Sequence, residues 1–290
     1  MGGKTKSSLI GWQFVALPSA IILLFSFYPM VQSLLLSFQS GKGTVYEYVG
    51  FANYTRLFSD PVFRQALLNT LLYLIIQVPI MLLLGLVIAN FLNIPKLRFK
   101  GFYRTAIFLP CVTSLVSYAI LFKSIFSIDG IANQMLLNLH LIDEPIAWLM
   151  DPVWARIVII LAITWRWTGY NMIFYLSAMQ NIDPSVYEAA SIDGASKTRQ
   201  FFRITVPLLK PILLFTAIIS TNGTLQLFDE VVNITNGGPG NSTMTISQYI
   251  YNLSFVYTPN FGYAATVSYA IVIIVAVLSL IQMKVGGEKR

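Results

Sequence analysis

The polar side chains best suited to bind a ligand lie inside otherwise apolar runs of the sequence. In one run Arg166 is followed by Trp167, Tyr170 and Asn171. Aromatic rings can stack on the apolar C–H face of a pyranose, and guanidinium and amide groups can hydrogen-bond its hydroxyls. We interpret these four residues as candidates for binding a sugar-like ligand. An alternative of equal standing is that Arg166 pairs with an acid or with helix carbonyls of a partner subunit.

A second apolar run, 206–228, carries Asn222, Gly223, Thr224 and Gln226 between its middle and its C-terminal end. These residues fit a polar strip that faces a cavity. Asn, Thr and Gln side chains also hold neighbouring membrane helices together by hydrogen bonds. The sequence leaves both interpretations open, and it excludes neither a ligand path nor a helix–helix contact.

A third group of residues lies between these two runs, in the loop 181–207. Asp183 followed by Pro184 predicts a helix start, because the carboxylate can cap and proline's fixed φ suits the first helical position. Gly194 predicts the left-handed end of that helix. A Glu-Ala-Ala tripeptide that begins at Glu188 lies between them, and its small residues allow another backbone to approach closely. The loop therefore predicts a short docking helix.

Composition indicates which kind of environment positions these residues. The chain has 290 residues, of which 56% are hydrophobic and 11% charged, and its mean hydropathy is +0.68. Soluble domains usually contain about 25% charged residues, so this chain belongs in lipid. The net charge of +7 comes from basic clusters beside apolar runs. These clusters are typical of membrane topology signals and do not indicate nucleic-acid binding.

Six runs reach the roughly 20 apolar residues that a membrane-spanning helix needs. Internal prolines do not exclude them, since neighbouring helices can satisfy the freed backbone groups. We therefore predict an all-α integral membrane protein with six transmembrane helices. The predicted spans cover residues 12–38, 68–92, 106–126, 153–179, 206–228 and 263–283.

The distribution of charge predicts the orientation of these spans. Lys and Arg concentrate near both ends of the chain and in two connecting loops, 96–104 and 197–210, whereas most acids lie in the remaining loops. The positive-inside rule then places both termini and the loop 181–207 in the cytoplasm. Segments 39–67 and 229–261 are predicted to be ordered loops on the outer side.

The sequence predicts neither a catalytic residue nor a metal site. His140 lies in an outer loop without companion ligands, and Cys111 is interpreted as a small packing residue. The stretch 40–44 resembles a phosphate-binding loop only superficially, because Leu36 stands where the first glycine is required. The chain therefore needs a separate ATPase if its transport is driven by ATP.

The loop 181–207 resembles a known motif. Glu188-Ala189-Ala190, Gly194, Ile204 and Pro207 are similar to the EAA loop of bacterial ABC importer permeases, with Val206 in place of the usual Leu. Two further segments, Phe108–Pro110 and Thr235–Pro239, are similar to sugar-type permeases of the maltose and multiple-sugar importer group. The resemblance covers roughly residues 10–285.

This resemblance implies a type I ABC importer permease fold as a single permease domain, 1–290, in the bacterial cytoplasmic membrane. It implies a second, homologous permease subunit, two ATPase subunits that use ATP and Mg, and an extracytoplasmic sugar-binding protein, with no cofactor held by this chain. The residues implied in ATPase coupling are Pro184, Tyr187, Glu188, Ala189, Ala190, Asp193 and Gly194. The positions implied to line the sugar cavity are Arg166, Trp167, Tyr170, Gly223, Thr224 and Leu227.

Other classes of protein stay open at this stage, although the sequence favours them less. An ion-coupled secondary transporter usually has acids or histidine within its spans, whereas here Asp229 lies only at an outer edge. A membrane enzyme needs a nucleophile with a base, or metal ligands, within reach. Among ABC importers, a carrier of glycerol-phosphate-type esters would use Arg166 as its anion partner.

Overall fold

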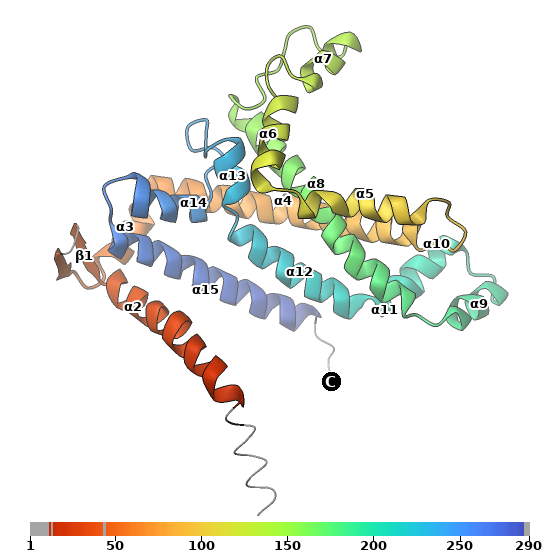
Figure 1. The fold of residues 1–290 in the computed structure, drawn as a ribbon, viewed down its shortest axis with the longest axis horizontal. Helices are drawn as coiled ribbons and strands as arrows, with labels where there is room; N and C mark the ends of the chain where they lie inside the picture. Colours follow the sequence, from red (N-terminus) through yellow and green to blue (C-terminus); the bar gives the residue numbers. More distant parts are fainter. Residues whose placement is uncertain (1–11, 13, 43–44, 287–290) are drawn as a thin grey trace, which may run out of the picture. The chain divides into compact units, whose positions relative to one another are not determined.

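The computed structural model describes residue 12 and residues 14–42 and 45–286. The regular secondary structure of the described chain is helical apart from one two-stranded sheet, which confirms the prediction of a helical membrane protein (Figure 1). The two chain termini, predicted to be cytoplasmic, lie outside the described residues. The chain divides into two compact units.

The smaller unit comprises the described residues up to Asp60 together with residues 250–270. Its first helix spans Phe14–Ser37, and the two short strands that follow are antiparallel, with Gln39 opposite Tyr48. The elements of this unit are a π-helical turn Leu23–Phe27, α2 Tyr28–Ser37, β1 Gln39–Lys42, β2 Val45–Tyr48, α3 Ala52–Ser59, a π-helical turn Asn252–Val256 and the first part of α15 Phe261–Gly286.

Polar side chains close the smaller unit where its first helix ends. The Asn53 amide donates to the carbonyl oxygens of Ser37 and Gln39, at 2.9 and 2.8 Å. Gly262 passes so near that a Cβ there would lie 1.9 Å from the Gln39 carbonyl oxygen. A glycine is therefore required at this crossing, because no side chain could be accommodated without moving backbone.

The larger unit comprises residues 61–249 and 271–286 of the described chain, and it contains the elements that position the ligand candidates. Its long helices α4 and α8 pack along each other, and α5 lies against α8 (Figure 1). The elements are α4 Pro61–Leu92, α5 Lys100–Val112, α6 Leu115–Ile125, α7 Ile131–Asn138, α8 Pro152–Gln180, α9 Pro184–Ile192, α10 Lys197–Gln200, a π-helical turn Phe201–Thr205, α11 Val206–Leu208, α12 Lys210–Leu225, α13 Asp229–Ile234, α14 Ile246–Tyr251, which crosses into the smaller unit, and the second part of α15.

Two apolar cores stabilise the larger unit. One joins α4 and α8 near their Leu92 and Met179 ends, and it includes the fully buried Tyr175, whose hydroxyl hydrogen-bonds the Thr216 hydroxyl at 2.7 Å. The other joins α6, α8 and α13 around Tyr118 and Val231. The ligand candidates of α8 lie between these two cores.

The third predicted span, 106–126, is not one straight helix. The structure bends by 100° between α5 and α6. Pro110 lacks an amide hydrogen, and Thr113, at the C-cap of α5, has extended backbone angles with its hydroxyl bonded to the Pro110 carbonyl oxygen at 2.8 Å. The break therefore begins at Thr113, within one helical turn after Pro110.

A second bend of 68° lies at Leu209, between the helix Lys197–Leu208 and α12. The described residues thus contain four helices long and apolar enough to cross a membrane, or six if each bent pair counts as one span. The six predicted spans correspond to these four helices and two bent pairs.

Segment 127–151 is ordered by one buried side chain. The Asn133 amide nitrogen donates to the carbonyl oxygens of Ile128 and Ile146, both at 2.9 Å. Its amide oxygen accepts from the Ile146 amide at 3.1 Å and from the Trp148 indole at 2.8 Å. Asn133 is 1% exposed, so all four contacts are shielded from water.

Replacing Asn133 by leucine is expected to destabilise this segment by at least about 2 kcal/mol, because two buried donors lose their acceptor. The measurement is the rate of limited proteolysis within 127–151 for the full chain in membranes. Asn138→Leu is the matched control, since Asn138 is exposed on the same helix. Equal cleavage of both variants and the parent chain would contradict the role of Asn133.

The segment that holds the predicted Thr235–Pro239 motif is anchored to α4. The Asn69 amide donates to the carbonyl oxygens of Asn241 and Met244, both at 2.9 Å. The Thr235 and Thr243 hydroxyls hydrogen-bond each other at 2.8 Å. These contacts fix the chain between α13 and α14 against α4.

Candidate functional site

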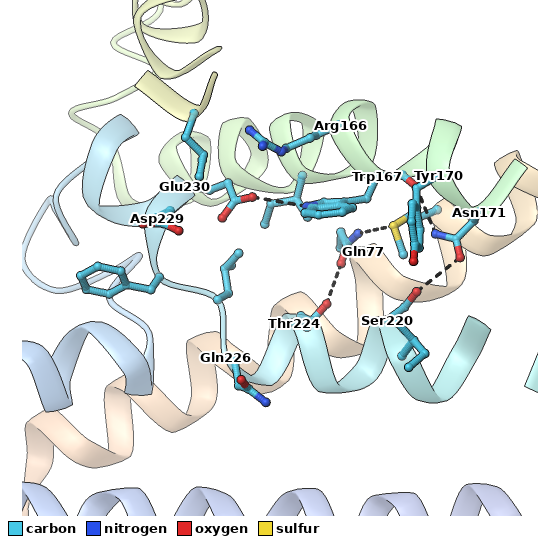
Figure 2. Close-up of a pocket in the computed structure, with 17 residues that line it drawn as sticks. Gln77, Arg166, Trp167, Tyr170, Asn171, Ser220, Thr224, Gln226, Asp229 and Glu230 are labelled. Atoms are coloured by element: carbon cyan, nitrogen blue, oxygen red, sulfur yellow. Dashed lines mark hydrogen bonds between the residues drawn. The ribbon is translucent and has the colours of Figure 1, made fainter. Parts of the chain in front are cut away.

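A cavity of about 410 Å³ lies in the larger unit between α4, α8, α12 and α13 (Figure 2). Eight of the nine residues predicted to form the substrate path line it: Arg166, Trp167, Tyr170, Asn171, Gly223, Thr224, Gln226 and Leu227. The structure therefore brings together candidates from two separate apolar runs. Their role in substrate passage stays a prediction.

Helical periodicity explains which α8 residues face the cavity. Ile163, Arg166, Trp167, Tyr170 and Asn171 all line it. Their spacing follows the 3.6-residue repeat, so one face of α8 carries the whole group. The rings of Trp167 and Tyr170 meet edge to face, with centroids 5.9 Å apart and an interplanar angle of 89°.

Asn222 is the predicted path residue that does not line the cavity. On α12 the lining residues are Ile219, Ser220, Gly223 and Thr224, and Asn222 falls on another face of the helix. It is half-buried, and its amide oxygen has no hydrogen-bond partner among the described residues. Asn222 was predicted to face the cavity together with Gly223 because the two are adjacent in sequence. Adjacent residues of an α-helix, however, point about 100° apart.

Arg166 is buried and only weakly bonded. Its Nη2 donates to the Thr113 carbonyl oxygen at 3.5 Å, at the break between α5 and α6, while Nε and Nη1 have no partner among the described residues. The guanidinium carbon lies 5.1 Å from the Tyr118 ring centre and 5.6 Å from that of Trp167. In this structure two aromatic rings and the Thr113 carbonyl thus surround its charge.

Sequence reasoning missed several cavity residues, of which Gln77 and Glu230 carry the most chemistry. The Gln77 amide oxygen accepts from the Thr224 hydroxyl at 3.2 Å and links α4 to α12. Gln77 is fully buried, and its sequence signal is no more than a polar side chain within an apolar run, which does not place it in the cavity. Glu230 was assigned to an outer loop, and only its fold placement shows that it lines the cavity.

Glu230 is 6% exposed and accepts a hydrogen bond from the Trp167 indole at 3.3 Å. Burial raises the pKa of its carboxyl above the ordinary value, while hydrogen bonds and the charge of Arg166 oppose that rise. Indole, amide, hydroxyl and carboxylate groups around one cavity suit the recognition of a polyhydroxylated molecule. The described residues contain no cluster of His, Cys, Asp or Glu suited to hold a metal ion.

The loop 181–207 forms the predicted short helix, α9. Asp183 caps it by accepting from the Ser185 amide at 2.9 Å, and this hydrogen bond lowers the pKa of the Asp183 carboxyl. Gly194 ends it at φ +75°, with the Ala195 amide bonded to the Ala190 carbonyl oxygen at 2.9 Å. Both ends therefore have the geometry that the local sequence predicts.

The middle of α9 faces outward. Pro184, Glu188, Ala189 and Asp193 are exposed, whereas Tyr187 and Ala190 are half-buried. The Tyr187 hydroxyl bonds the Thr205 hydroxyl at 2.9 Å, which ties α9 to the helix Lys197–Leu208. Figure 1 shows α9 beyond the end of α8, beside α10. A partner that binds α9 can thus act on the bent pair that ends in α12.

Long apolar helices, a polar cavity among them and a protruding capped helix define the class of protein: a multi-pass, all-helical membrane transport protein. The family described as "binding-protein-dependent transport system inner membrane component" matches residues 81–284, and the chain belongs to this family. It is therefore a transport permease, not itself catalytic, with the type I permease fold that the sequence predicted.

Similar proteins agree with this assignment. The chain is 57% identical over 282 residues to the lactose transport system permease protein LacF of Rhizobium radiobacter, covering 97% of this chain and 95% of the relative. It is 37% identical over 232 residues to the arabinooligosaccharides transport system permease protein AraP of Halalkalibacterium halodurans, covering 79% of this chain and 72% of that protein. A crystal structure of a bacterial ABC transporter involved in alginate import shares the fold, with a TM-score of 0.86, 24% identity and 98% and 96% coverage.

Proposed function

We propose that this chain is the permease subunit of an ATP-driven importer of oligosaccharides, with the cavity between α4, α8, α12 and α13 as its substrate path. The observation that carries the proposal is the cavity lining, where Trp167, Tyr170 and several hydrogen-bonding groups meet in one space. The similarity to LacF over nearly the whole chain supports a disaccharide such as lactose as a test substrate.

The proposal includes partners that supply energy and substrate. A second, homologous permease completes the path, two ATPase subunits use ATP and Mg, and an extracytoplasmic binding protein delivers the sugar. Both termini of this chain lie in the cytoplasm, where α9 docks on an ATPase subunit. The exposed Glu188 and Ala189 support this role of α9, because a docked helix can transmit rigid-body closure of a partner to membrane helices.

Purification of the tagged chain from its native membranes in mild detergent tests the assembly. The expected result is co-purification of an ATPase and a second permease, with ATP hydrolysis stimulated by binding protein and lactose. Recovery of a lone chain or a homodimer at every salt and detergent condition would contradict the proposal and favour an ion-driven carrier.

Trp167→Ala is expected to lower lactose uptake at subsaturating concentration at least about tenfold. The variant loses the ring that would stack on the sugar and the indole N–H that donates to Glu230. The measurement is initial uptake of radiolabelled lactose, corrected for the amount of chain in the membrane. Trp165→Ala is the control, since Trp165 stacks on Tyr118 with centroids 5.9 Å apart and does not line the cavity. Equal losses in the two variants would contradict a specific role of Trp167.

A further inference from the structure

Glu230 is a buried charge that general sugar binding leaves unexplained. It lies in the first turn of α13, lines the cavity and is 6% exposed. Among the described side chains, the Trp167 indole donates a hydrogen bond to its carboxylate, at 3.3 Å. A carboxylate has about four sites for accepting hydrogen bonds. The Trp167 indole and the backbone amide of Glu230 itself occupy part of that capacity, and the rest is left for a ligand.

Arg166 does not neutralise Glu230 by direct contact. Figure 2 shows the guanidinium on the side of Trp167 away from Gln77 and Thr224. The described contacts of Arg166 are the Thr113 carbonyl oxygen at 3.5 Å and the rings of Tyr118 and Trp167. Its Nε and Nη1 atoms are enclosed without a partner among the described residues. Donation to a ligand would require this side chain to move.

The groups that face the cavity are rich in acceptors. Asp229 and Glu230 both line it, against the single lining cation Arg166. The Gln77 amide oxygen has one described donor, the Thr224 hydroxyl at 3.2 Å, and the Asn171 amide oxygen has one, the Ser220 hydroxyl at 3.5 Å. A ligand that brings hydroxyl donors fits this lining, whereas a ligand that brings negative charge meets two carboxylates.

We propose that Glu230 is a specificity-determining residue of the cavity, which accepts hydrogen bonds from hydroxyls of a neutral saccharide and disfavours saccharides that carry a carboxylate or phosphate. The inference rests on the proposed function, because it assumes that the cavity binds saccharide. Hydrogen bonds to an ionised acceptor are stronger than neutral ones, and like charges repel strongly in a poorly solvated cavity. The two effects act in the same direction.

This inference disfavours a glycerol-phosphate-type substrate for this chain. A phosphate ester would have to reach Arg166, whose donors are enclosed behind Trp167, while it lies beside Glu230. A neutral sugar needs no such movement, since hydroxyl groups can donate to Glu230 directly. The preference therefore follows from the Glu230 carboxylate, which faces the cavity, and from the Arg166 guanidinium, which lines the cavity but keeps its Nε and Nη1 atoms enclosed.

The test compares equilibrium binding of two ligands to the purified complete importer in lipid nanodiscs, without its binding protein. The ligands are radiolabelled lactose and the matching disaccharide whose galactose C6 is oxidised to a carboxylate. We expect the parent protein to bind lactose at least about tenfold more tightly than the oxidised disaccharide, as the ratio of the two dissociation constants. In Glu230→Gln this ratio is expected to fall below about threefold. Glu230→Asp is expected to keep the preference, and Glu144→Gln is the matched control because Glu144 is exposed and does not line the cavity.

The ratio of the two affinities distinguishes a loss of specificity from a folding defect, since a damaged structure would weaken the binding of both ligands to a similar extent. An unchanged ratio in Glu230→Gln, or equal binding of both ligands by the parent protein, would overturn the role of Glu230 while leaving saccharide binding intact. Absence of lactose binding by the parent protein would overturn the proposed function and this inference with it. A narrowed ratio in Glu144→Gln would also overturn the assignment to Glu230.

Discussion

Replacing Glu188 by lysine is expected to reduce sugar uptake at least a hundredfold, on the order of 3 kcal/mol of coupling energy, while the chain still reaches the membrane. Glu188 is exposed in the middle of α9 and the structure gives its side chain no described partner. A charge reversal there does not disturb this chain's own packing. Any large effect must therefore act through a protein that binds α9. If that protein offers a cation to Glu188, the lysine places a like charge against it.

The measurement is initial uptake of labelled lactose together with the ATPase activity of the purified assembly. Uptake is expected to fall, and ATP hydrolysis to lose its stimulation by lactose and binding protein. Glu144→Lys is the control, since it makes the same change at an exposed acid in segment 127–151. Normal uptake in Glu188→Lys would remove the coupling role from α9.

Gly194 offers a second variant with a different physical cause. A leucine there meets no atom within 4 Å of its Cβ, but it must adopt a φ of +75°, which costs a non-glycine residue about 1–2 kcal/mol. The end of α9 would loosen although no contact is lost. Uptake of labelled lactose is therefore expected to fall in Gly194→Leu. The amount of ATPase subunit that stays bound to the purified chain is expected to fall less than in Glu188→Lys.

The shape of α9 was predictable because local interactions decide it. Asp183 caps the helix within two residues, and Gly194 ends it through hydrogen bonds that reach back only a few residues. The cavity face of α8 was predictable for a similar reason, since the helical repeat aligns Arg166, Trp167 and Tyr170 without reference to any other element. Sequence spacing alone carries such information.

Residues whose position depends on distant elements were not predictable. Glu230 is buried because α13 packs on α6 and α8, and nothing in its own neighbourhood indicates a cavity. Gln77 joins the site through Thr224, 147 residues away. The break at Thr113 was missed for another reason: Pro110 marks a tolerated kink in many membrane helices, and the size of the bend depends on tertiary packing.

The second large effect is expected at Gly169, where alanine should destabilise the fold by about 3 kcal/mol or more, beyond the usual range for overpacking. A Cβ there would lie 2.1 Å from the Ile107 carbonyl oxygen and 2.8 Å from its carbonyl carbon. It would also lie 3.0 Å from the Phe108 Cα. These atoms all belong to the backbone of α5, so no side-chain rotation relieves the contact and the helix itself must move away from α8.

The sign of this effect distinguishes packing from helix propensity. Alanine is a better helix former than glycine by about 1 kcal/mol, so propensity alone predicts that Gly169→Ala stabilises α8. Gly101→Ala is the matched control, because a Cβ there meets nothing within 4 Å, and it should leave stability unchanged or slightly raised. The measurement is the thermal unfolding midpoint of the purified full chain in detergent. A second measurement is the amount of each variant that is found in the membrane. Because α5 leads directly to the break at Thr113, its displacement should also disturb the hydrogen bond from Arg166 to the Thr113 carbonyl oxygen. A midpoint equal to that of Gly101→Ala would show that α5 and α8 do not meet backbone to backbone.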